Sequence, residues 1–217
     1  MTNTVSDIKA IWEDKAQSLG DDPHCTLPDY NLRHLEAQYI MRHLQPGDHA
    51  LDIGCGNGTT TVQFAEHVEH IIGGDYAPTM IEKAKELHLR DNVEYQVLDI
   101  LKIDAPDEAF DTVITERCII NLPDWETQKD SIREVARVLK PGGRFLMCES
   151  YEEAMVKFSA LRESYGLSPM VRHENNYLIR EEWLTEFLPE LFTIDAVEKM
   201  GMYYMVSRIA HPLFVAP

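Results

Sequence analysis

Apolar and polar residues follow two patterns that alternate along the chain. Short apolar runs predict buried strands, and longer stretches with an apolar residue every three or four positions predict helices. The predicted strands lie at residues 49–54, 70–75, 92–100, 109–117 and 143–150, and the predicted helices at 30–44, 59–68, 77–90 and 125–140. This order of elements predicts an α/β fold built on a doubly wound, mostly parallel sheet.

The C-terminal third departs from this alternation. Residues 192–198 and 202–209 have the pattern of two more strands, and the link around Gly201 is too short for a crossover. They are therefore expected to pair as an antiparallel hairpin and to complete a seven-stranded sheet. A single domain with four parts is predicted: a helical segment over the site (1–45), a cofactor-binding core (46–150), a small helical lid (151–190) and a strand pair (191–217).

Charge and cysteine content narrow the class of protein. The formal net charge is −17 and the chain has no cluster of Lys and Arg, so a nucleic-acid partner is not expected. Four scattered cysteines without a CxxC pair indicate reduced thiols and no metal site. Without a long apolar run or a signal-peptide pattern, the chain is expected to be cytoplasmic and not inserted in a membrane.

One short stretch, LDIGCGNGTTT at residues 51–61, contains three glycines at alternate positions between a strand and a helix. Glycine permits unusual backbone angles and leaves no side chain to keep a ligand away. A tight turn between strand and helix explains the loop as well as a nucleotide site does, because a lone glycine-rich loop is weak evidence. The motif residues are Asp52, Gly54, Cys55, Gly56, Gly58 and Thr59.

Acidic residues at the ends of the next three strands favour the ligand site. Asp75 ends the second strand, Asp99 closes the third, and Glu116 with Arg117 ends the fourth. Each aspartate alone is also typical of a turn. The carboxyl ends of parallel strands meet at one edge of the sheet, so the joint pattern points to a ribose and adenine site there.

In order and spacing these segments resemble the motifs of class I S-adenosylmethionine-dependent methyltransferases. The matching segments are LDIGCGNGTTT, GGDYAP, VLDI, FDTVITERCIINLPDW and LKPGGRFLMCES, within residues 30 to 150. The resemblance implies S-adenosylmethionine as the cofactor, with its methionine end along the glycine loop. It also implies that Asp75 accepts from the ribose hydroxyls and that Glu116 and Arg117 face the donor methyl and the acceptor. The adenine would be flanked by Tyr76 and Met80 and covered by Asp99 and Ile100.

The chain lacks the Asn/Asp-Pro-Pro-Tyr sequence of the enzymes that methylate nucleobases or protein glutamine. The leading hypothesis is therefore transfer of a methyl group to an oxygen or nitrogen of a small molecule, with a sugar or lipid-linked head group as a variant. Two other classes stay open: a nicotinamide-dependent oxidoreductase, disfavoured by the early third glycine, and a non-catalytic cofactor-binding module.

Three further residues are candidates for the site. Arg33, near Tyr30 at the start of the first helix, either binds the cofactor carboxylate or is a solvated arginine on the helix face. His173 in the expected lid is the candidate general base for a hydroxyl acceptor, although a polar surface histidine is the favoured explanation of this residue. The apolar tail, residues 201–217, packs either on its own sheet or on a second copy in a homodimer.

Overall fold

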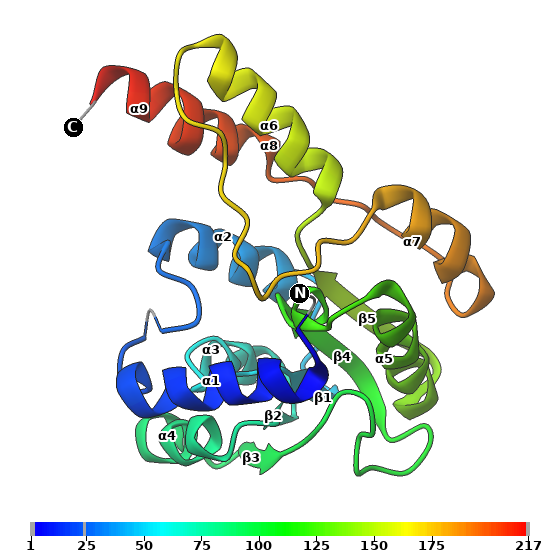
Figure 1. Cartoon of the computed structure of the whole chain (residues 1–217). Helices are drawn as coiled ribbons and strands as arrows, with labels where there is room; N and C mark the ends of the chain where they lie inside the picture. Colours follow the sequence, from blue (N-terminus) through cyan, green and yellow to red (C-terminus); the bar gives the residue numbers. More distant parts are fainter. Residues whose placement is uncertain (1–2, 24, 216–217) are drawn as a thin grey trace. The chain divides into compact units, whose positions relative to one another are not determined.

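The computed structural model describes residues 3–23 and 25–215. They fall into two compact units, residues 1–149 and 150–217 (Figure 1). Residues 1–2 and 216–217, the ends of the expected N-terminal segment and apolar tail, lie outside the described residues.

The first unit is built on a five-stranded parallel sheet with the strand order β3-β2-β1-β4-β5 (Figure 1). The strands are β1 (His49–Ile53), β2 (His70–Asp75), β3 (Val93–Val97), β4 (Phe110–Glu116) and β5 (Leu139–Cys148). After β3 the chain crosses to the other side of β1, where β4 pairs Ala50 with Thr112. The order of strands reverses at this point, which is where such sheets bind ligands beyond the carboxyl ends of the strands.

Helices cover the sheet. They are α1 (Val5–Leu19), α2 (Tyr30–Met41), α3 (Thr61–Phe64), α4 (Pro78–His88) and α5 (Trp125–Val138), with short 3₁₀ turns η1 (Ala65–His67) and η2 (Ile119–Asn121). Their starts have local causes: the carboxylate of Asp29 accepts the N–H of Leu32, and that of Asp124 accepts the N–H of Thr127. Such caps satisfy amide groups that the first turn leaves unpaired.

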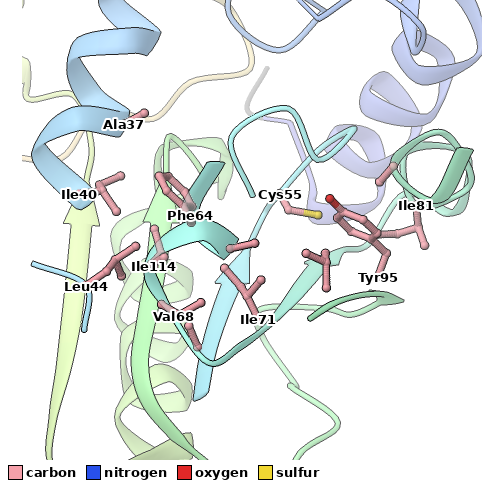
Figure 2. Packing of buried hydrophobic residues seen from close by; sticks show 14 residues of the cluster. Ala37, Ile40, Leu44, Cys55, Phe64, Val68, Ile71, Ile81, Tyr95 and Ile114 are labelled. Atoms are coloured by element: carbon pink, nitrogen blue, oxygen red, sulfur yellow. The ribbon is translucent and has the colours of Figure 1, made fainter. Parts of the chain in front are cut away.

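The main core lies on one face of the sheet, where α2, α3 and α4 contribute apolar side chains (Figure 2). Ile40, Phe64 and Ile81 from these helices belong to one buried cluster with Ile71 and Ile114 of the strands. The buried face of α2 differs from the expected one. Helical spacing predicts a face with Leu32, Leu35 and Tyr39; of these only Leu32 is buried, and the other buried residues of α2 are Arg33, Glu36, Ala37 and Ile40.

The second unit corrects the expected hairpin. It contains α6 (Glu152–Ser164), α7 (Glu181–Phe187), η3 (Leu188–Glu190), α8 (Gly201–Tyr204), the π-helical turn η4 (Met205–Ala210) and α9 (His211–Phe214). The residues expected to form the second strand of the hairpin are therefore helical, and the described part of the chain has five strands instead of seven.

Packing within the second unit explains this difference. Short apolar runs suit either a helix or a strand. Here Ile209 is buried, and the ring of Tyr204 lies 5.6 Å from that of Phe158 on α6. Phe214 stays 86% exposed, so packing of the tail on a second copy stays a prediction. Among the described residues no helix has both the length and the apolar character needed to cross a membrane.

Candidate cofactor site

The glycine loop begins where β1 ends, and three of its residues have positive φ angles. Gly54 has a φ of 84° and Gly58 a φ of 78°, which other residues rarely adopt. Side chains also press against the loop. A Cβ on Gly54 would lie 2.5 Å from Sγ of Cys118, and one on Gly58 would lie 2.6 Å from the hydroxyl of Tyr95. These glycines are thus required by the packing of the loop itself, a cause that the sequence pattern did not reveal.

Two buried aspartates flank this loop. The carboxylate of Asp75 accepts the N–H of Gly56 at 3.0 Å and that of Ala77 at 2.9 Å. Burial raises the pKa of Asp75 to about 6, although these N–H bonds lower it. Asp52 accepts the hydroxyl of Thr61 at 2.6 Å, and burial raises its pKa to about 7. The two strand ends therefore carry negative charge that is poorly solvated and able to accept hydrogen bonds.

A narrow cavity of about 20 Å³ lies at the ends of β2 and β3. Tyr76, Asp99 and Ile100, three of the residues expected at the adenine, line it together with Cys118 and Asn121. Met80 is buried in a neighbouring cluster that includes Tyr76. The adenine candidates of β2 and β3 are thus brought together.

Helix α1 closes this cavity. It lies beside α4 (Figure 1), and its Ile8 and Lys9 line the cavity. Nζ of Lys9 lies 2.5 Å from Oδ2 of Asp99, and the hydroxyl of Tyr76 donates to the carbonyl of Ile8 at 3.3 Å. Lys9 therefore pairs with an aspartate that was expected to cover the adenine, and no local pattern indicated this contact.

A second cavity, of about 80 Å³, lies at the start of α2 and beside the glycine loop. Tyr30, Arg33 and Thr59, three of the predicted cofactor residues, line it together with His34. Arg33 is buried, not a solvated arginine on the helix face. Its guanidinium donates to the carbonyl of Pro23, to Oγ1 of Thr26 and to the carbonyl of Leu27. The arginine is thus held in place at this cavity.

The end of β4 forms a cluster of charged groups. Glu36 of α2 is 4% exposed and accepts from Nε and Nη2 of Arg117, at 3.1 and 2.5 Å. Burial, and after it the nearby carboxylates of Glu36 and Asp52, raise the pKa of Glu116 to about 8. Glu116 is therefore largely protonated at neutral pH. The sequence did not single out Glu36, although it stands in an apolar stripe between Leu32 and Ile40.

Asn57 and His173 lie outside these clusters. Asn57, which the sequence analysis did not single out, is buried and donates to the carbonyls of Gly20 and Asp22, so it ties the glycine loop to the chain after α1. His173 lies in the second unit, in an exposed segment between α6 and α7. Its role as a general base stays a prediction.

Comparisons with known proteins agree with this geometry. Residues 50–143 match the family model described as "Methyltransferase domain". This stretch, somewhat less than half of the chain, is a methyltransferase domain. The match covers β1 to β5 up to Gly143, which includes the glycine loop and all three strand-end acids. The match favours a methyltransferase over the nicotinamide-dependent oxidoreductase that the sequence left open.

Two relatives and one solved structure illustrate the family. The 27-O-demethylrifamycin SV methyltransferase of Amycolatopsis mediterranei is 32% identical over 64% of this chain and 53% of its own length. The ubiquinone biosynthesis O-methyltransferase of Coxiella burnetii is 24% identical over 96% of this chain and 84% of its own. The chain thus spans about half the length of the first. The PH0226 protein of Pyrococcus horikoshii has a TM-score of 0.65 at 24% identity, over 81% of this chain and 87% of its own.

Proposed function

We propose that the protein transfers a methyl group from S-adenosylmethionine to an oxygen or nitrogen of a small-molecule acceptor. The observation that carries the proposal is the buried carboxylate of Asp75 beside the glycine loop, with Asp99 at the end of the adjacent strand. Two carboxylates at neighbouring strand ends suit a ligand that offers ribose hydroxyls at one end and an amino group at the other.

The residues of the first unit suit the parts of this cofactor. Asp75 would accept from the ribose hydroxyls, and Asp99 from the adenine amino group against the apolar side chain of Ile100. Arg33 and Thr59 would hold the methionine end at the second cavity. Because Lys9 now pairs with Asp99 and the adenine cavity is only about 20 Å³, α1 must shift for an adenosyl group to enter.

The cofactor supplies a methyl group on a positively charged sulfur, which a nucleophile displaces in line. The protein therefore has to align the acceptor and exclude water. A hydroxyl acceptor must also lose its proton, and Glu116 is the candidate base in the first unit. Since its pKa is about 8, the carboxylate is the main form only above that pH, and methylation of a hydroxyl should become faster as the pH rises through 8.

The choice of a small molecule rests on the strongly negative charge and on the missing Asn/Asp-Pro-Pro-Tyr sequence. Matched relatives are named as O-, N- and C-methyltransferases, so the acceptor atom belongs to the proposal. A sugar or lipid-linked head group is the variant. For such hydroxyl acceptors His173 would be the second candidate base.

The first experiment is calorimetric titration of the purified protein with S-adenosylmethionine, S-adenosylhomocysteine and NADH. Binding of the first two alone is expected. Release of S-adenosylhomocysteine is then measured with phenols, amines, sugars and lipid head-group analogues. Binding of NADH alone would refute the cofactor assignment. Cofactor binding without turnover of any acceptor class would favour a non-catalytic binding module.

A further inference from the structure

The segment that follows β4 has a backbone conformation that needs support. Arg117, the first residue after the strand, has a φ of 55°, which is unfavourable for a residue with a Cβ. The next residues form the short turn η2, and Nδ2 of Asn121 donates to the carbonyl of Arg117 at 2.6 Å. Such strain persists only where surrounding contacts hold the chain.

One carboxylate supplies most of this support. Glu149 follows directly after β5, which pairs with β4 up to Glu116. Its Oε1 accepts the N–H groups of Cys118 at 3.1 Å and Ile119 at 2.9 Å, and its Oε2 accepts that of Ile120 at 3.3 Å. Three successive amides that converge on one anion form a concave group of donors in which negative charge is favoured.

The supported segment touches both parts of the candidate cofactor site. Cys118 packs against Gly54, so closely that a Cβ on this glycine would lie 2.5 Å from Sγ. Cys118, Asn121 and Leu122 also line the cavity at Asp99. The position of the glycine loop and one wall of the adenine cavity therefore depend on a segment that Glu149 holds.

We propose that Glu149 is a positioning residue for the cofactor: its ionised carboxylate holds residues 118–122 against the glycine loop, and cofactor affinity depends on that contact. Glu149 itself is not assigned a contact with the cofactor. The inference rests on the proposed function, because it concerns the same site.

The pH dependence gives this role a signature. Burial raises the pKa of Glu149 to about 7, while the three N–H groups and the Arg117 guanidinium lower it. The thiols of Cys118 and Cys148 also lie near this carboxylate, and the Arg117 guanidinium that acts on it is paired with Glu36. Above pH 7 the ionised group accepts all three bonds. Below pH 7 the protonated group loses acceptor capacity, so the hold on the segment weakens.

Stability and affinity should then move in opposite directions. The folded protein binds the proton of Glu149 more tightly than the unfolded chain does, because the pKa is raised from 4.5 to about 7. This group therefore adds to the free energy of unfolding as the pH falls through 7 toward 4.5. Cofactor affinity should fall over the upper part of this range. A residue that is merely structural would change both quantities in the same direction.

The test uses Glu149→Gln, which keeps the shape and replaces one acceptor oxygen with an N–H group. Glu126→Gln is the matched control, because Glu126 is an exposed glutamate of α5 that pairs with Lys129. S-adenosylhomocysteine is titrated calorimetrically into the wild type and both variants from pH 6 to 8.5. We expect Glu149→Gln to weaken binding about tenfold at pH 8.5, the loss of about one charged hydrogen bond. The ratio of its Kd to that of the wild type should approach one at pH 6.

Hydrogen exchange tests the contact without the cofactor. At pH 8 the amides of residues 118–120 should exchange faster in Glu149→Gln, while the melting temperature does not fall. A Kd ratio that is independent of pH, or slow exchange at these amides in the variant, would overturn the positioning role. If the wild type binds S-adenosylhomocysteine and Glu149→Gln binds it equally well, this inference is refuted but the proposed function is not. Absence of binding by the wild type would refute the proposed function as well.

Discussion

Replacement of Asp75 by asparagine distinguishes two effects of its buried charge: the loss of folding stability that it causes and the cofactor affinity that it provides. Asp75 is 9% exposed, and burial raises its pKa from 3.8 to about 6. At about 1.4 kcal/mol for each pKa unit, the ionised carboxylate is about 3 kcal/mol less favourable in the folded protein than in the unfolded chain. Asp75→Asn removes this charge and keeps one oxygen that can accept from Gly56 or Ala77.

The substitution should therefore leave the protein without cofactor as stable as before, or more stable. The loss of one of the two N–H bonds lowers the free energy of unfolding by about 1 kcal/mol, and removal of the buried charge raises it by about 3 kcal/mol at pH 8. The net gain in stability is about 2 kcal/mol. Binding should respond in the opposite way. Hydrogen bonds from two ribose hydroxyls to a charged acceptor are each worth about 1.5–3 kcal/mol, so the Kd for S-adenosylmethionine should rise about 100-fold or more.

Urea unfolding at pH 8 and pH 5, together with calorimetric titration at pH 8, measures both effects. Wild-type stability should gain from protonation of Asp75 as the pH falls through 6, and the variant should lack that gain. The exposed Asp91→Asn is the control and should change neither quantity. A variant that is destabilised by more than about 1 kcal/mol at pH 8 and binds the cofactor normally would refute the reasoning.

Two further substitutions test the scaffold. Gly58→Ala introduces a Cβ at a φ of 78° and 2.6 Å from the hydroxyl of Tyr95, so urea unfolding should show a loss of about 3 kcal/mol. Gly47→Ala, which meets no atom within 4 Å, should be nearly neutral, and equal losses at both sites would contradict the packing argument. Arg144→Met removes the partner at 2.5 Å from buried Asp48 and should cost about 3 kcal/mol in urea unfolding without changing the cofactor Kd; a stable variant would show that the pair contributes little.

Sequence alone determined much of the first unit. The alternation of apolar runs and helical stretches allows few topologies, because crossovers between parallel strands are short and right-handed. Asp75 and Asp99 could therefore be placed at one edge of the sheet before any contact was known. Local periodicity was enough to place these strand ends, because the pattern that predicts each strand extends over only a few consecutive residues.

Only the tertiary structure revealed the partners of these groups. Lys9 and Asp99 are 90 positions apart, and Arg117 is 81 positions from Glu36. Glu149 reaches Ile119 across 30 positions. No local pattern encodes such pairs, because they depend on how helices and strand ends pack. Burial then shifts the pKa values of these groups, whereas the residue type by itself predicts only the usual pKa.

The C-terminal segment shows the same division. Residues 202–209 have enough apolar character for a strand or a helix, and periodicity over so few positions does not decide between them. In the structure Ile209 is buried and the segment is helical beside α6. A strand needs hydrogen-bonding partners from another strand, whereas a helix satisfies its own backbone. The choice was therefore made by the tertiary packing of the second unit and not by the segment's own sequence.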